Sequence, residues 1–280
     1  MEVRKPKNHR VKRRIVVICI GILFLLFASV SFSFLSQEEK VAKSSGTLLG
    51  NETTVTEKNR IAFIIDDIGY DPAPVHKIVQ LDIPITLSIL PHCPYSRKAA
   101  AEAALNGLEV ILHLPMEPYE YPEKNPGEGA LFTHMTKGEL IDLLEEDIEA
   151  VPAILGVNNH MGSLFMESED KLTIVFSELK KRNLFFVDSY TTSNSMGRRV
   201  AKKTGIVYAS RNIFIDNNGQ YRDTFEILDN LIKTRDRWKT LILIGHPYGS
   251  TLEALKVITP LLMAKGIDIV PLSTLVKPIS

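Results

Sequence analysis

The sequence has 280 residues, with 33 basic and 33 acidic side chains and therefore no formal net charge at pH 7. The balance is uneven, because residues 1–14 hold seven basic side chains and one acidic one, which leaves the remainder with a net charge of about −6. A mildly acidic domain without a basic stripe is not typical of a nucleic-acid-binding protein. A disulfide framework is also excluded, since Cys19 lies in an apolar run and leaves Cys93 alone.

The amino-terminal segment predicts a membrane anchor. Residues 15–34 are uncharged and mostly apolar, and twenty residues rising about 1.5 Å each would span roughly 30 Å, the thickness of a bilayer's hydrocarbon core. The basic residues 1–14 predict a cytoplasmic tail, with the rest of the chain across the membrane. The alternative is a cleaved signal peptide with a cleavage site near 28–31. The length of the apolar run favours an uncleaved anchor. Both alternatives predict an extracytoplasmic domain, periplasmic or extracellular, which is secreted if the segment is cleaved.

Residues 35–59 are polar, small and without period, and predict a flexible linker. Residues 60–280 are then the catalytic domain, long enough to bury a core. Strand-like and helix-like segments alternate in it, which is typical of parallel strands joined by helical crossovers. We expect an α/β fold, a distorted seven- or eight-stranded parallel β/α barrel. An open doubly wound sheet is the alternative, although no glycine-rich phosphate-binding pattern follows a strand. The expected strands cover 61–65, 84–89, 109–113, 154–158, 184–187, 206–209, 240–244 and 267–270, and the expected helices cover 73–80, 95–106, 137–150, 169–182, 195–203, 221–236 and 250–264.

Polar residues follow the expected strands, which predicts a site at the carboxyl ends of the sheet. Asp66 and Asp67 follow the first strand, and adjacent carboxylates repel each other unless a cation lies nearby or one of them serves as a base. The alternative is that Asp67 caps the next helix. His113 ends the third strand, and His160 and His246 follow the fourth and seventh strands. Two imidazoles, one carboxylate and an open position for water suit zinc or a neighbouring divalent ion in a hydrolase.

Five motifs lie in order along the domain: Asp66-Asp67-x-Gly69, His113-x-Pro115-Met116-Glu117-Pro118, Asn158-Asn159-His160-Met161-Gly162-Ser163, Asp188-Ser189 and Gly245-His246-Pro247. Together they resemble the divergent polysaccharide deacetylase family, distant relatives of the NodB-type deacetylases. The resemblance covers about residues 60–275. It implies a NodB-like distorted barrel and a metal-dependent hydrolase that removes acetyl groups from N-acetylated sugars.

The resemblance also implies roles for the motif residues. Asp66 corresponds to the general base, Asp67 to a metal ligand and His246 to the general acid. NodB-type enzymes take two histidine ligands from one short motif, whereas no second histidine follows His113 closely here. We therefore expect His113 and His160 to be the two histidine ligands of a divalent metal ion, zinc before others.

Six further polar residues are candidates for substrate binding or for support of the site. Arg211 and Asp216 are expected to orient Asp66 and His246 respectively, and the alternative for this pair is an ion pair on the surface. The other four candidates are Glu117, Asn159, Ser163 and Asp188.

These features predict a carbohydrate N-deacetylase of the cell envelope, with an N-acetylated glycan as its substrate. In the expected mechanism, Asp66 removes a proton from the attacking water and His246 protonates the departing amine. One alternative is an anchored envelope protein that binds a glycan or a partner protein at the same site without turnover. A metal-dependent phosphoesterase is disfavoured, because few basic residues lie near the strand ends. In the loop 114–135, Tyr119, Tyr121 and Phe132 either stack on sugar rings or pack within the loop. The sequence gives no indication of an oligomeric state.

Overall fold

The structure is a computed structural model that describes residues 58–279. The predicted basic tail 1–14, the predicted anchor 15–34 and all but the end of the predicted linker 35–59 lie outside the described residues. Among residues 58–279, no helix is long and apolar enough to cross a membrane. The first strand begins at Asn59, one residue before the expected start of the folded domain.

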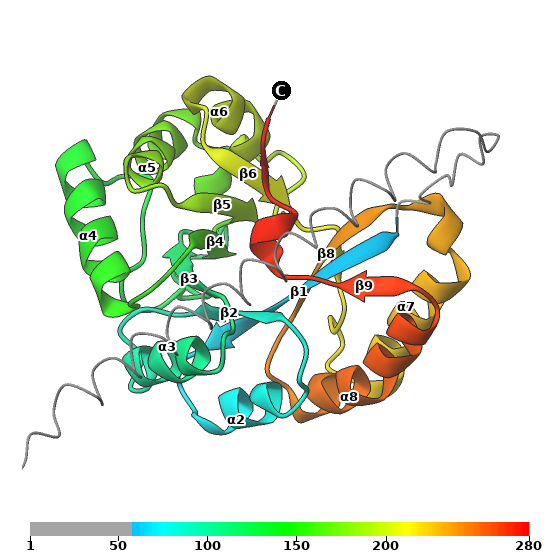
Figure 1. Ribbon diagram of the computed structural model, residues 1–280. Helices are drawn as coiled ribbons and strands as arrows, with labels where there is room; N and C mark the ends of the chain where they lie inside the picture. The colour runs from blue at the N-terminus through cyan, green and yellow to red at the C-terminus, as the bar shows by residue number, and fades with distance from the viewer. Residues whose placement is uncertain (1–57, 280) are drawn as a thin grey trace, which may run out of the picture. The chain divides into compact units, whose positions relative to one another are not determined.

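Ten strands of the described chain form one curled sheet (Figure 1), in the order β10-β6-β5-β4-β3-β2-β1-β8-β7, with β9 paired to the start of β1. All pairings are parallel except that of β10 with β6. The two ends of this order, β10 and β7, do not pair within the described residues, so the sheet is an open half-barrel. The predicted α/β class with a parallel sheet is therefore confirmed, whereas the predicted barrel of seven or eight strands is not. The strands are β1 (Asn59–Ile68), β2 (Ile85–Ile89), β3 (Val110–Met116), β4 (Gly156–Met161), β5 (Phe185–Asp188), β6 (Val207–Ser210), β7 (Ile213–Phe214), β8 (Thr240–Gly245), β9 (Ile267–Ile269) and β10 (Lys277–Pro278).

Seven α-helices of the described chain surround the curled sheet (Figure 1). Local signals set some of their ends: Thr136 and Glu139 form a capping box at the start of α4, and α6 ends at Gly205 in a left-handed conformation. Every expected helix and strand is present, with each end within three residues of the expected one. The helices are α2 (Ala73–Val79), α3 (Ser96–Leu105), α4 (Lys137–Ala150), α5 (Glu169–Lys181), α6 (Gly197–Thr204), α7 (Tyr221–Lys233) and α8 (Gly249–Ala264).

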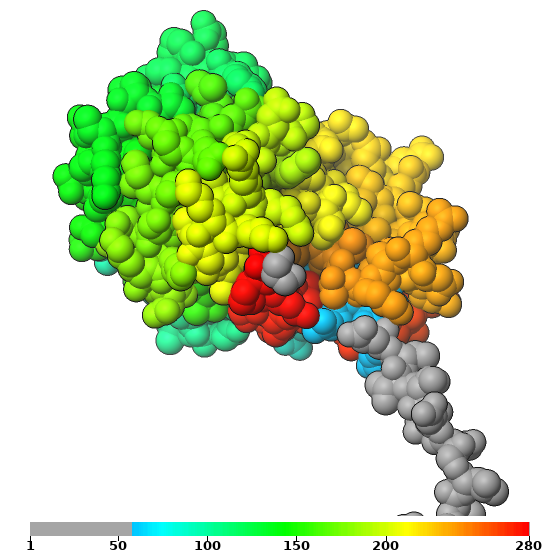
Figure 2. Space-filling view, turned by 90° about the horizontal axis from the view of Figure 1, so that it is seen from above, coloured from blue at the N-terminus to red at the C-terminus, as the bar shows by residue number. Residues whose placement is uncertain are grey.

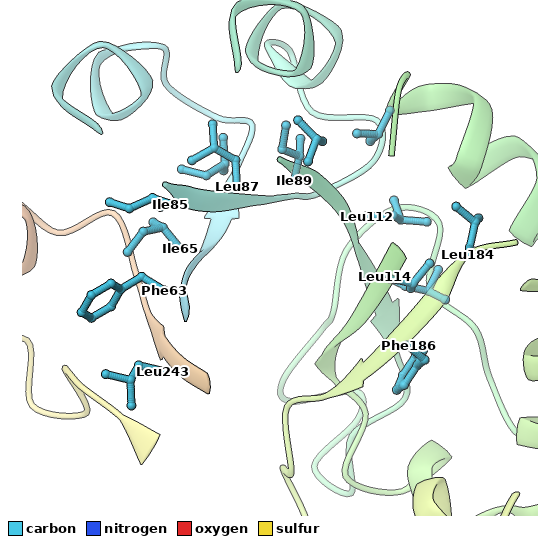
Figure 3. Packing of buried hydrophobic residues seen from close by; sticks show 14 of the residues in the cluster. Phe63, Ile65, Ile85, Leu87, Ile89, Leu112, Leu114, Leu184, Phe186 and Leu243 are labelled. Carbon is cyan, nitrogen blue, oxygen red and sulfur yellow. The ribbon is translucent and has the colours of Figure 1, made fainter. Parts of the chain in front are cut away.

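Alternation along the strands sorts the apolar side chains into two layers. In β1, Phe63 and Ile65 belong to an outer layer that packs against the helices, together with Leu87 of β2 and Leu243 of β8 (Figure 3). The residues between them face the inside of the curl. This inner layer consists of Ala62, Ile64, Ile111, Phe185, Val187, Ile242, Ile244 and Leu272.

The carboxyl-terminal segment covers the amino-terminal end of the curl. β9 pairs with residues 59–61 at the start of β1, and β10 pairs with β6. Between these strands, Leu272 of a short 3₁₀ helix (Leu272–Thr274) is fully buried in the inner layer. Figure 2 shows this segment in red between the blue start of β1 and the yellow β6 region. A functional site inside the curl is therefore restricted to the opposite end, where the strands have their carboxyl termini.

Candidate metal centre

The inward-facing positions change from apolar to polar toward the carboxyl ends of the strands. Asp66 lies two residues after the inner residue Ile64 in β1, and His113 lies two residues after Ile111 in β3. His246 likewise follows an inner residue of β8 by two positions. Because residues two apart in a strand face the same side, these three polar side chains point into the curl.

β4 brings two more polar side chains to the same side. Asn158 pairs with His113 in the neighbouring strand, and His160 pairs with Pro115. His113, expected at the end of its strand, and His160, expected after its strand, both lie inside their strands, because β3 and β4 each end three residues later than expected. Gly162 follows with a φ of +80°, and a Cβ there would lie 2.8 Å from the Cβ of Met116. The turn after His160 thus requires glycine.

A β-bulge brings Asp67 to the same side as Asp66. In a regular strand these adjacent residues would point to opposite faces. Between Ile65 and Ile68, however, three steps along β1 match two steps along β2, and Asp67 has a left-handed φ of 57°. An extra residue in a strand re-aims the side chains next to it. Two consecutive carboxylates can therefore face one site.

Three side chains bring donor atoms together at this end of the sheet. Asp67 Oδ1 lies 3.1 Å from His113 Nε2 and 3.1 Å from His160 Nδ1, and the two nitrogens are 3.1 Å apart. Ligands about 2.1 Å from a tetrahedral zinc ion lie roughly 3.4 Å from one another. Asp67 Oδ1 is also buried and makes no hydrogen bond of suitable geometry. The three residues thus form a group that could hold a divalent metal ion, as predicted for the cofactor.

The charges in this group shift the pKa values of its members. Burial alone would raise the pKa of Asp67, but His113 and His160 outweigh burial and lower it. Burial likewise would lower the pKa of His113, which is 2% exposed, but the carboxylates of Asp66 and Asp67 raise it to about 9. The two carboxylates thus favour the protonated form of His113.

Asn158 contacts both His113 and Asp66, although no role was predicted for it. It is fully buried, and its Oδ1 lies 2.7 Å from Ser88 Oγ and 2.8 Å from His113 Nδ1. Its Nδ2 donates to Asp66 Oδ1 at 2.8 Å and to Ser189 Oγ at 3.3 Å. The signal in the sequence is its spacing of two residues from His160 in the same strand.

His246 is held by Asp216 on the other side of the site. Its Nδ1 lies 2.9 Å from Asp216 Oδ1, and its backbone N–H donates to Asp216 Oδ2 at 2.6 Å. Its Nε2 lies 4.0 Å from Asp67 Oδ2. Burial would lower the pKa of His246, but the hydrogen bond and the charge of Asp216 raise it above its usual value. A Cβ at Gly245 would lie 2.9 Å from Ile215 Cγ1 and 3.2 Å from Asp216 Oδ2, so glycine leaves room for both side chains.

Arg211 does not hydrogen-bond to Asp66, contrary to expectation. Its guanidinium donates to the carbonyl oxygens of Ser189 and Tyr190 and lies 3.8 Å above the ring of Phe214. That ring stacks on the imidazole of His246, with centroids 5.9 Å apart. Arg211 therefore supports the wall of the site beside His246. Within the described residues it forms no surface ion pair either.

Two of the other candidates fasten the loop that follows β3. The Glu117 carboxylate accepts hydrogen bonds from the backbone N–H and the hydroxyl of Thr133, at 2.7 and 2.6 Å. Ser163 Oγ accepts one from the backbone N–H of Tyr119 at 3.0 Å. Both side chains therefore order the loop beside the group formed by Asp67, His113 and His160.

Asn159 and Asp188 order the segment that follows β5. Asn159 Oδ1 accepts a hydrogen bond from the backbone N–H of Ser189 at 2.8 Å. The buried Asp188 carboxylate accepts hydrogen bonds from the hydroxyls of Ser195 and Tyr208. These contacts fix the loop that carries Ser189 next to Asn158.

A curled, mostly parallel α/β sheet with an Asp, His, His group at its carboxyl end has the architecture of NodB-type deacetylases. Residues 63–276 match the divergent polysaccharide deacetylase family, and the chain therefore belongs to that family. The resemblance seen in the sequence motifs is thereby confirmed.

Two curated relatives are uncharacterised bacterial proteins. The chain is 32% identical to YibQ of Escherichia coli over 198 residues, which cover 70% of this chain and 61% of YibQ. It is 29% identical to a protein of Haemophilus influenzae over 199 residues, which cover 71% of this chain and 70% of that protein. The chain thus spans about three fifths of the length of YibQ.

Solved structures support the assignment of the fold. An uncharacterised protein of Agrobacterium tumefaciens superposes with a TM-score of 0.74 at 23% identity, over 79% of this chain and 91% of that one. A deacetylase solved with substrate gives a TM-score of 0.50 at 12% identity, over 79% of this chain and 94% of that one. At these identities the likeness shows the fold alone.

Proposed function

We propose that the protein is a metal-dependent hydrolase that removes acetyl groups from an N-acetylated polysaccharide of the cell envelope. The main observation is the meeting of the Asp67, His113 and His160 donor atoms within 4.8 Å, beside a second carboxylate and a third imidazole. A protein that only binds a glycan has no need for a base and an acid around a metal site. Membership of the deacetylase family supports the same conclusion.

The metal ligands in this proposal are Asp67 Oδ1, His113 Nε2 and His160 Nδ1. Nitrogen and carboxylate donors in this number suit zinc with one position open. A divalent ion there supplies polarisation of the acetamide carbonyl and a water of lowered pKa.

Asp66 acts as the general base. Its Oδ1 is held by the Asn158 amide, and its Oδ2 lies 3.8 Å from His113 Nε2, next to the donor group. The carboxylate is therefore fixed in orientation and is placed to accept the proton of the attacking water.

His246 acts as the general acid. Asp216 binds its Nδ1 and raises its pKa, which favours the imidazole that carries its second proton. That proton is on Nε2, the nitrogen nearest to Asp67. The nitrogen of the departing amine needs this proton, because an amide anion is a poor leaving group.

Exposed aromatic side chains around the site support a sugar as the substrate. Tyr70, Tyr119, Tyr190 and Tyr248 come shortly after β1, β3, β5 and β8, and each is exposed by about half or more of its surface. Aromatic faces of this kind stack on the apolar faces of sugar rings.

The proposal places the domain outside the cytoplasm. Residues 15–34 anchor the chain in the membrane, residues 1–14 remain cytoplasmic, and the linker 35–59 connects the anchor to the catalytic domain 60–280. If the anchor segment is cleaved, the domain is secreted.

The direct test is acetate release from N-acetylated oligosaccharides by the full-length protein in detergent micelles, with and without zinc. We expect zinc-dependent release, lost in Asp66→Asn and retained in His76→Ala. His76 is a suitable control because it lies on α2 in a contact with Glu102 on the protein surface. Glycan binding without any acetate release would instead favour the non-catalytic envelope protein.

A further inference from the structure

The Asn158 side chain touches both functional parts of the site. One side of its amide faces His113, a proposed metal ligand, and the other side faces Asp66, the proposed base. The side chain is fully buried, so every polar atom of the amide must find its partner within the protein.

The surroundings permit one orientation of this amide. With Oδ1 toward Ser88 and His113, the oxygen accepts two hydrogen bonds, at 2.7 and 2.8 Å. The two amide hydrogens then reach Asp66 Oδ1 and Ser189 Oγ. A flipped amide would place its oxygen 2.8 Å from a carboxylate oxygen, where neither atom has a hydrogen to donate. The observed orientation therefore satisfies all four hydrogen-bonding positions of the amide.

We infer that Asn158 is a positioning residue that couples the metal ligand to the base. Its oxygen holds the proton of His113 on Nδ1, which leaves Nε2 as the nitrogen that faces Asp67 and a metal ion. Its amide group holds Asp66 Oδ1, which leaves Oδ2 to accept a proton. This inference rests on the proposed function for the meaning of the two roles, but the hydrogen bonds themselves do not depend on it.

An amide suits this position better than a carboxylate. Metal-binding histidines usually donate their second N–H to a carboxylate or a carbonyl oxygen, which fixes the tautomer and the ring orientation. A carboxylate at 158 could accept from His113 in the same way. It would also place an acceptor oxygen where the amide now donates to Asp66 Oδ1 at 2.8 Å, and neither oxygen has a hydrogen to donate. The hydrogen bond that orients Asp66 would then be lost.

Two substitutions separate the two roles. Asn158→Asp keeps the acceptor for His113 and removes the donor that orients Asp66, whereas Asn158→Leu removes both hydrogen bonds at a similar side-chain volume. Thr86→Val is the matched control, because Thr86 is a buried polar residue of β2 whose hydroxyl contacts Glu109 and neither His113 nor Asp66.

The first readout is the His113 Nδ1–H resonance in the metal-free full-length protein, recorded by NMR with ¹⁵N-labelled histidine. We expect a resonance protected from exchange in the wild type, in Asn158→Asp and in Thr86→Val, and its loss in Asn158→Leu. The second readout is zinc affinity, which should fall by roughly 10- to 100-fold in Asn158→Leu and stay near the wild-type value in Asn158→Asp. Acetate release should be lost in both Asn158 variants.

The two proposals fail in different ways. If the wild type releases no acetate, the proposed function is wrong, while the Nδ1–H resonance and the zinc affinities still test the role of Asn158. If Asn158→Leu folds and keeps both the protected resonance and the wild-type zinc affinity, the inference is wrong. If Asn158→Leu does not fold, Asn158→Asp decides: full acetate release in that variant would overturn the coupling to Asp66.

Discussion

Asp67 Oδ1 and His113 Nε2 lie 3.1 Å apart, although β2 separates their strands in the sheet. Neighbouring strands are about 4.8 Å apart, so β1 and β3 are separated by roughly twice that distance along the sheet. The curl of the sheet and the small side chain of Ser88 on β2 let the two side chains meet. Ser88 is fully buried and faces the same site, where it donates to Asn158.

Ser88→Leu should abolish zinc binding without unfolding the protein. The larger side chain would occupy the space across which Asp67 and His113 meet, and overpacking of this kind costs about 1–3 kcal/mol of stability. Calorimetric titration with zinc and thermal unfolding measure the two effects. Ser88→Ala adds no volume and should keep zinc binding. Wild-type zinc affinity in a folded Ser88→Leu variant would show that the space is not needed.

Zinc binding should strengthen as the pH rises. The nearby carboxylates raise the pKa of His113 to about 9, so below that pH a metal ion must displace a proton from this residue. The apparent association constant should therefore rise by about tenfold per pH unit between pH 6 and 8 and level off above pH 9. Titrations at several pH values in non-chelating buffers measure this slope. A constant affinity across this range would exclude His113 as a ligand that loses a proton on binding.

Asp216→Asn should shift the pH dependence of hydrolysis. Asp216 raises the pKa of His246, and a general acid must be protonated to work. Activity falls as the pH rises through that pKa, so a lower pKa moves the alkaline limb of the kcat/KM profile to lower pH. The acidic limb, which the base determines, should stay in place. An unchanged alkaline limb would mean that His246 is not the acid.

Asp147→Asn should stabilise the protein increasingly as the pH rises. Asp147 is fully buried, one of its oxygens lies 2.8 Å from His92 Nε2, and the other has no partner. Burial, with the charges of Glu146 and Glu128, raises its pKa to about 8. The folded state therefore holds a proton that the unfolded state loses near pH 4, and this stabilisation is lost progressively as the pH rises from about 4 to about 8.

Asparagine has no such proton to lose. The difference in unfolding free energy between Asp147→Asn and the wild type should thus grow by about 1 kcal/mol per pH unit in favour of the variant between pH 5 and 8. Urea unfolding at pH 5, 6.5 and 8 measures it. A difference that does not depend on pH would show that Asp147 is ionised throughout this range.

The sequence contains enough information to predict most of the fold. Apolar runs of four to six residues and amphipathic segments place every principal strand and helix within three residues of its observed bounds. The two-residue strands β7 and β10 have no periodicity to detect, since alternation needs several residues. Whether the sheet closes depends on pairing between distant strands, which local patterns do not encode.

The three residues of the candidate metal site could be predicted from the sequence. The backbone geometry that brings them together could not. Paired acids and histidines near strand ends identify Asp67, His113 and His160. The bulge that turns Asp67 inward has no sequence signal other than the acid pair itself. The place of Asn158 could have been predicted, because it lies two residues before His160 in the same strand and therefore faces the same side of the sheet. The contacts of Arg211 depend on the ring of Phe214, whose position only the folded chain defines.

The central claim is that residues of β1, β3 and β4 bind one metal ion. The most direct measurement is X-ray diffraction from zinc-soaked crystals on both sides of the zinc absorption edge. We expect a single strong anomalous peak about 2.0–2.2 Å from Asp67 Oδ1, His113 Nε2 and His160 Nδ1. Zinc bound elsewhere, or at this end of the sheet without these three atoms, would contradict the account.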